Sequence, residues 1–157
     1  MTTIIDATVA GENANSYITT AVATTTAAAL GMASVATLSS TVFESALVRA
    51  TNEIDAHHFH HEYKYSATQA RVFPRSGDLL VGVPFIPEPV KLAQVIQAEW
   101  IAVGGEPDRK QFDGPKIGPL GTNSPLCPAA LQHLAKYISR AGEYKDRCRT
   151  GFQPVLP

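Results

Sequence analysis

Apolar residues recur at helical spacing in the first half of the chain, and the clearest run predicts a helix from about Val42 to Phe59. Its apolar positions follow at i, i+3, i+4, i+7 and i+11, namely Phe43, Ala46, Leu47, Ala50 and Ile54. That spacing places them in one stripe on the helix surface. Thr41 and Glu44 have the form of a capping box, in which each side chain covers an exposed backbone donor of the other residue. We therefore expect this helix to begin after Thr41 and to bury one face.

Three further helices are predicted along the chain. The first runs from Thr19 or Thr20 to Leu30, with Thr19 as its cap and Gly31 as its end. The second is opened by Pro87 and Pro89, because the first turn does not need the N–H that proline lacks, and Gly104-Gly105 stop it. Its expected buried face is Val90, Ala93, Ile96 or Gln97, Trp100 and Ile101. The last runs from Pro128 to near Gly142, with an inner face of Leu131, Leu134, Ala135 and Ile138.

The segments between these helices are predicted to be long loops. Nine of the eleven prolines lie between Pro74 and Pro128, and residues 62–86 read as irregular. Residues 1–18 read as an extended arm with a turn at Gly11-Glu12-Asn13, and Lys116–Leu120 has room for a short strand. The expected fold is mainly α, a small bundle of three to four helices with long Pro-rich loops and extended N- and C-terminal arms. We assign residues 1–157 to one domain: arm 1–18, helical core 19–105, loop 106–127, and C-terminal helix with tail 128–157.

Charge and cysteine content narrow the function classes. The 157 residues carry a net charge of −1, which excludes a polycation that holds DNA by bulk electrostatics. The uncharged run between Glu12 and Glu44 contains too many Thr, Ser and Asn residues to supply the roughly 20 apolar residues of a membrane span. No leader with a basic start and an apolar centre is present, so secretion is not indicated. Cys127 and Cys148 are accordingly expected to be free thiols.

The sequence contains only weak signals for metal binding and for catalysis. His57 and His61 are four residues apart and could share a metal on a helix, but zinc sites normally need three or four ligands. The favoured interpretation of the run His57-His58-Phe59-His60-His61 is a polar helix end, where imidazoles interact with the last carbonyls. No nucleophile elbow, P-loop or dinucleotide fingerprint is present. We therefore expect no cofactor and no enzymatic activity.

Aromatic and cationic residues interleave between residues 63 and 75. The set is Tyr63, Lys64, Tyr65, Arg71, Phe73 and Arg75. Stacking aromatics beside cations are typical of single-stranded nucleic-acid binding. The favoured alternative is that the rings anchor a loop on the core while the cations face water, because the near-neutral chain offers no wider electrostatic footprint.

Three blocks of this sequence resemble one known family. They are the stretches 46–55 through Phe59, 69–77 and 86–93 with Glu99, preceded by Ala14-Asn15-Ser16-Tyr17-Ile18. Together they are similar to the head–tail connector proteins of tailed phages, also called adaptor or head-completion proteins, some of which are labelled DnaT-like single-stranded DNA-binding proteins. The resemblance covers roughly residues 11–103. The chain departs from the family in its Ala/Thr-rich first helix, in the histidine run, and in its C-terminal third.

The resemblance implies a non-enzymatic virion protein. Such a protein forms a ring of about twelve copies at the head–tail vertex, after a period in the host cytoplasm. Its implied partners are copies of itself, the portal protein, and a downstream neck or tail-completion protein; double-stranded DNA passes through the channel without sequence-specific binding, and no membrane is involved. The alternative is a single-stranded DNA-binding protein acting in replication.

Eight residues in or beside the resembling blocks are candidates for structural or interface roles. They are Arg49, Asp55, Phe59, Phe73, Pro74, Arg75, Pro87 and Trp100. We expect Arg49 and Asp55 to pair with loop groups or a neighbouring molecule, and Phe73-Pro74 to hold the 62–86 loop on the helix pair.

Overall fold

The computed structural model describes residues 4–57, 59, 63–104 and 126–138, and all structural statements concern these residues. In chain order the elements are α1 (Thr20–Ala29), α2 (Ala33–Thr37), α3 (Ser40–Asp55), β1 (Leu79–Leu80), β2 (Val83–Pro84), α4 (Glu88–Ala102) and α5 (Pro128–Leu134). The expected fold class, a mainly helical protein with long loops, is confirmed. The helix α2 and the hairpin formed by β1 and β2 were not predicted.

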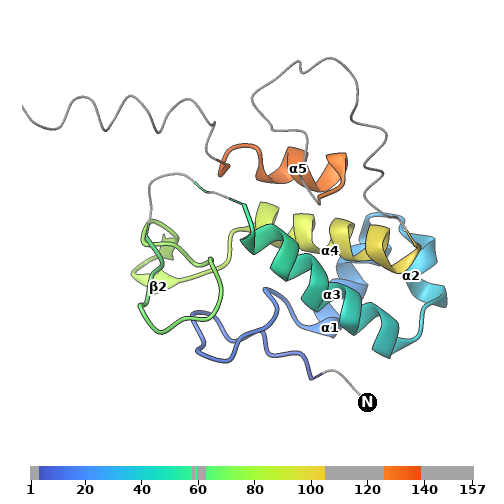
Figure 1. The fold of residues 1–157 in the computed structure, drawn as a ribbon, viewed down its shortest axis with the longest axis horizontal. Coiled ribbons are helices and arrows are strands. Elements are labelled where there is room, and N and C mark those ends of the chain that lie inside the picture. Colours follow the sequence, from blue (N-terminus) through green and yellow to red (C-terminus); the bar gives the residue numbers. More distant parts are fainter. Residues whose placement is uncertain (1–3, 58, 60–62, 105–125, 139–157) are drawn as a thin grey trace, which may run out of the picture.

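The antiparallel helices α3 and α4 pack together at the centre of the molecule, and the other elements are arranged around them (Figure 1). α5 packs on α4, α2 lies at the end opposite the hairpin, and α1 lies against α3 and α4 and reaches α2. Two apolar clusters fill the interior. One gathers Phe73, Ile54 and Val90 with residues of α5; the other gathers Leu47, Phe43 and Val95 with α1 and α2.

The start of α3 differs from the prediction. Ser39, not Thr41, is the N-cap, and its Oγ accepts a hydrogen bond from the backbone N–H of Val42 at 3.4 Å. Glu44 therefore stands too far along the helix to complete a capping box, and its Oε1 instead accepts from the Thr20 hydroxyl at 3.5 Å. Ser39 and Thr41 are both residue types that cap helices, and the contact of α1 with α3 through Thr20 and Glu44 accompanies the choice of the earlier one.

The end of α3 was also placed too late. The helix stops at Asp55, and Phe59, predicted as its last residue, instead forms an isolated antiparallel bridge with Ile138. That long-range pairing is a tertiary contact that overrides the local pattern. α5 likewise ends at Leu134, well before Gly142; Leu134 and Ile138 are buried as expected, whereas Ala135 is exposed.

The predictions for α1 and α4 are confirmed at both ends. Thr19 caps α1 through a bond from Val22 N–H, and Gly31 follows the helix with φ +72°. α4 begins after Pro87 and ends before Gly104. Its buried face includes the expected Val90, Ala93 and Gln97, but Gln94 is buried as well, while Trp100 and Ile101 are half-buried.

Some predictions lie outside the described residues. They concern most of the 106–127 loop with its strand at Lys116–Leu120, the tail beyond Ile138, His61 and Cys148. Among the described helices, none combines the length and the apolar character that a bilayer crossing requires.

Candidate functional site

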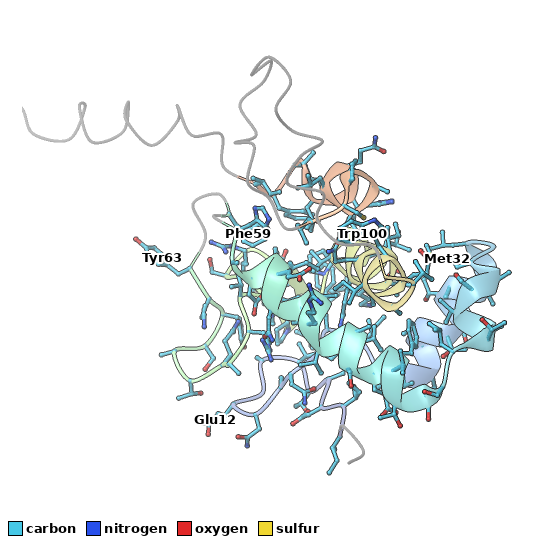
Figure 2. All side chains as sticks on the ribbon, turned by 45° about the vertical axis from the view of Figure 1, so that its right-hand side comes forward. Glu12, Met32, Phe59, Tyr63 and Trp100 are labelled. Atoms are coloured by element: carbon cyan, nitrogen blue, oxygen red, sulfur yellow. The ribbon has the colours of Figure 1, made fainter. Side chains whose placement is uncertain are left out.

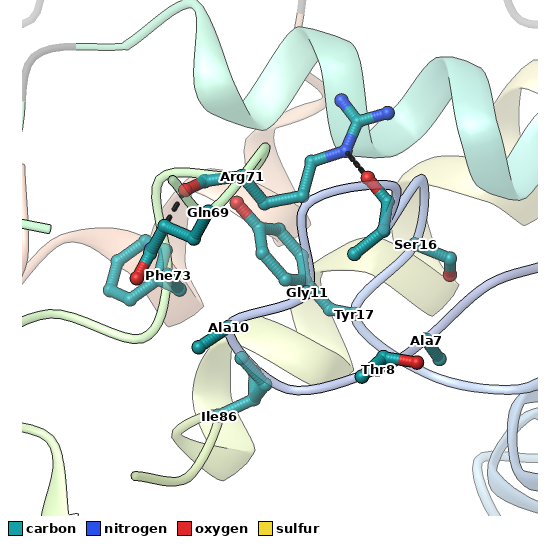
Figure 3. Close-up of a pocket in the computed structure, with 11 residues that line it drawn as sticks. Ala7, Thr8, Ala10, Gly11, Ser16, Tyr17, Gln69, Arg71, Phe73 and Ile86 are labelled. Carbon is teal, nitrogen blue, oxygen red and sulfur yellow. Dashed lines mark hydrogen bonds between the residues drawn. The ribbon is translucent and has the colours of Figure 1, made fainter. Parts of the chain in front are cut away.

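The N-terminal arm is tied to α3 and to the 63–86 loop by Arg71. Its Nε donates to the backbone carbonyl of Ala14 at 2.9 Å, which is the bond dashed at Arg71 in Figure 3. Its Nη1 donates to Asn52 at 2.6 Å and to Asp55 at 3.5 Å. The Arg71–Asp55 ion pair is mostly shielded, with side chains 17% and 16% exposed. The Tyr17 hydroxyl donates to the other oxygen of Asp55. Three segments distant in sequence therefore meet at one carboxylate.

The ionisation of this junction is shaped by burial. Burial raises the pKa of Asp55 above its ordinary value, although the bond from Tyr17 and the charge of Arg71 oppose that effect. Burial, followed by the negative charge of Asp55, also raises the pKa of Tyr17 well above its ordinary value. Both groups are engaged with partners inside the fold. Their arrangement indicates a structural junction and offers no free acid or base to a substrate.

Phe73 lies at the centre of an aromatic cluster beneath this junction. It is 1% exposed and makes edge-to-face contacts with Phe59, Tyr137 and Tyr17 at centroid distances of 5.0, 5.7 and 5.9 Å. The Arg75 guanidinium lies 5.9 Å from the ring centroids of both Phe59 and Phe73. These contacts attach the loop to the N-terminal arm and to the segments that follow α3 and α5, so the cluster joins the two halves of the described chain.

Two buried glutamines on α4 complete the frame. The Gln94 side chain accepts from Tyr17 N–H at 3.2 Å and donates to Ser16, Leu47 and Thr51. Gln97 donates to Glu53 at 2.7 Å and accepts from the backbone N–H of Cys127 at 2.7 Å. Buried polar groups are stable only with such partners. The helical pattern marked the position of Gln97 but could not reveal these partners, which come from other elements.

The remaining predicted site residues are placed as follows. Arg49 pairs with Glu53 one turn along its own helix at 2.9 Å, and not with the loop in the described chain. The other alternative, that Arg49 contacts a neighbouring molecule, stays a prediction. Asp55 does pair with the loop, through Arg71. Pro74 is buried behind Phe73, Pro87 precedes α4, and Trp100 packs half-buried against the Phe73 cluster.

The described residues provide neither a metal site nor a reactive cysteine. His57 follows α3, its predicted partner His61 lies outside the described ranges, and no group of three potential metal ligands occurs within them. Cys127 is a buried thiol that caps α5, and burial raises its pKa, the reverse of what activates a nucleophilic cysteine.

The residues proposed for nucleic-acid stacking separate into two sets. Phe73 is buried, Arg71 is held by Asp55 and Asn52, and the Lys64 ammonium donates to the carbonyls of Gln69 and Ala70 at 3.2 and 3.4 Å. Tyr63 and Tyr65, by contrast, are 85% and 44% exposed. Only these two rings of the set are available for stacking on a base.

The most prominent surface feature was missed by the sequence reasoning. Strands β1 and β2 form a hairpin, and Phe85 follows it directly. We call residues 79–85 the tip hairpin. Its large side chains face solvent. The exposed fractions are 43% for Leu79, 66% for Leu80, 97% for Val81, 64% for Val83 and 37% for Phe85. A signal was present in the uncharged apolar run Leu79 to Pro87, but Val81-Gly82 is not a common turn pair and hid the hairpin.

Comparison with known proteins identifies a family but no individual relative. The model of the family described as "Putative DnaT-like ssDNA binding protein" matches residues 1–113 of the 157. No curated protein and no solved structure matches the chain. The family's description is that of a binding protein rather than an enzyme, and it agrees with the single-stranded DNA hypothesis more directly than with the head–tail hypothesis.

Proposed function

This chain belongs to the family described as "Putative DnaT-like ssDNA binding protein". From the surface of the described fold, and not from that description, we propose that it acts by assembly, as an adaptor subunit that forms a ring between the portal and the neck or tail of a tailed phage. In this role it works without catalysis and without a cofactor. Its partners are copies of itself, the portal protein and the next neck or tail component.

The tip hairpin is the observation that carries this proposal. Val81 is 97% exposed and Leu80 66%, which is unusual for large apolar residues on a protein that acts alone. A two-stranded hairpin is only marginally stable without further packing. Contact with a neighbouring molecule would supply that packing, as expected for a subunit of an assembly.

The charge distribution favours a subunit that lines a channel for DNA over a protein that binds DNA tightly. The net charge is −1, and the cations of the loop are engaged internally: Arg71 with Asp55, Arg75 over two aromatic rings. A duplex that must slide through a ring is slowed by strong phosphate contacts, because each contact releases counterions and adds affinity. A near-neutral subunit suits such passage.

Single-stranded DNA binding is the second candidate, and two observations favour it. One is the description of the family itself. The other is the exposure of Tyr63 and Tyr65, which are two positions apart and can each stack on a base. In this case the chain would act on replication intermediates rather than in the virion.

Electron microscopy and mass analysis of purified phage particles test the leading proposal. A ring of this protein between head and tail is the expected result, and absence of the protein from mature particles overturns it. Oligonucleotide binding by the purified chain tests the second candidate in parallel: tight binding that weakens steeply with salt favours it over the adaptor role.

A further inference from the structure

An apolar groove lies between α1 and α2. It encloses about 250 Å³ and is lined mainly by small or apolar residues, among them Ala28, Met32, Val35 and Ala36. A buried apolar cavity of about 150 Å³ is large enough to bind benzene. The groove therefore has room for one or two aliphatic side chains, and the described residues of the chain leave it open.

The groove and the tip hairpin lie at opposite ends of the molecule. Figure 1 shows β2 at one end and α2 at the other, and Figure 2, from a different direction, places Met32 at the α2 end, far from Tyr63 on the loop side. The tip hairpin thus cannot fill the groove of its own chain. A second copy can bring its hairpin there.

The two surfaces match in charge. No charged residue occurs between Glu12 and Glu44, the stretch that contains the whole groove. None occurs between Asp78 and Glu88, the stretch that contains the tip hairpin. Bringing the two stretches together therefore buries apolar surface without stripping water from a charged side chain of either stretch. The carboxylate of Glu99 lies beside α2, where it accepts a hydrogen bond from Ser34, a residue that does not line the groove.

The conformation of the hairpin tip points the same way. Val81 has φ +52° and Gly82 φ +80°, a backbone shape that suits Asn-Gly far better than a β-branched residue. Within the described fold, the 97% exposed Val81 side chain receives no packing in return for this strain. Burial of the Val81 side chain against another molecule would offset this strain.

We propose that Leu80 and Val81 of one copy insert into the α1–α2 groove of the next copy. The contact joins two different surfaces, so it is head-to-tail, and such contacts build closed rings when their rotation closes. This inference rests on the self-assembly in the proposed function and specifies which surfaces carry it. Leu80 and Val81 form the tip, and Ala28 and Met32 line the receiving groove.

Paired variants of the full chain test the contact. Leu80→Glu places a charge on the tip, and Ala28→Glu places one in the groove; both positions are exposed in the single chain, so melting temperatures should not change. Each variant alone should self-associate about a hundredfold more weakly in sedimentation velocity, because it buries an unpaired charge. Val42→Glu and Ala29→Glu, at exposed positions outside both surfaces, should assemble like wild type. Val81→Asn, which suits the turn, should weaken assembly while leaving the fold intact.

Mixing the two variants gives the decisive result. The Leu80→Glu chain keeps an intact groove and the Ala28→Glu chain keeps an intact tip, so together they should form a 1:1 dimer that grows no further. A mixture that stays monomeric overturns the tip-to-groove contact.

Three further outcomes separate the failures. Wild-type assembly that neither variant weakens overturns the contact alone and leaves the adaptor role standing. A lower melting temperature for Ala28→Glu, with assembly unchanged, means that the groove is filled within a single chain, which also overturns the contact. A wild-type chain that is monomeric at every concentration and absent from particles overturns both the contact and the proposed function.

Discussion

Replacing Phe73 with alanine tests the central cluster of the fold most sharply. Phe73 is 1% exposed and touches the rings of Phe59, Tyr137 and Tyr17, which come from three separate segments. Truncating a buried phenylalanine costs about 4 kcal/mol, from lost apolar burial and the cavity left behind. In a protein of 157 residues this corresponds to a fall in melting temperature of roughly 8–16 °C.

Phe85→Ala is the matched control for that experiment. It removes the same atoms from the same loop, but Phe85 is 37% exposed, and the expected cost is about 1–2 kcal/mol. Calorimetry or circular dichroism at several protein concentrations measures both variants and separates folding from assembly. If Phe73→Ala melts within about 2 °C of Phe85→Ala, the aromatic cluster does not hold the loop to the helices and the reasoning fails.

Three other perturbations follow from the same contacts. Gln94→Ala leaves the buried Tyr17 N–H without its acceptor and should lower the free energy of unfolding by about 3 kcal/mol in urea titrations. The raised pKa of Asp55 means that the folded chain holds its proton more tightly than the unfolded chain. Stability of wild type relative to Asp55→Asn should therefore fall as pH rises through the folded-state pKa of Asp55. Replacing both Tyr63 and Tyr65 with alanine should leave self-association unchanged, and should weaken any oligonucleotide binding about tenfold or more.

Each of these has its own control and refuting outcome. Gln132→Ala removes an exposed glutamine from α5 and should be nearly neutral; equal losses for both glutamines would contradict the role of Gln94. For Asp55, a relative stability that rises with pH would mean that the ion pair with Arg71 outweighs burial. For the tyrosines, loss of assembly in gel filtration would place the subunit contact on the loop rather than on the tip hairpin.

The helices were predictable where local signals and packing agree. Thr19 with Gly31, and Pro87 with Gly104, bound α1 and α4 because caps and breakers act over a single turn. The prediction for α3 was displaced at its start because Ser39 is an equally good cap, and only the approach of Thr20 to Glu44 distinguishes the two sites.

The parts that were missed depend on partners distant in sequence. Phe59 leaves the helical pattern to pair with Ile138, and Gln94 is buried because Ser16 and Thr51 supply its bonds. No local window contains those residues together. The tip hairpin escaped for a different reason: its turn uses Val81 in a conformation that sequence rules assign to Asn or Gly.

Native mass spectrometry of the purified full chain, with and without a single-stranded oligonucleotide, tests the central claim most directly. The account predicts a concentration-dependent series of oligomers of this chain alone, unchanged by the oligonucleotide and lost in the Leu80→Glu variant. A monomer that binds the oligonucleotide, releases it as salt rises, and keeps this behaviour in Leu80→Glu would contradict it.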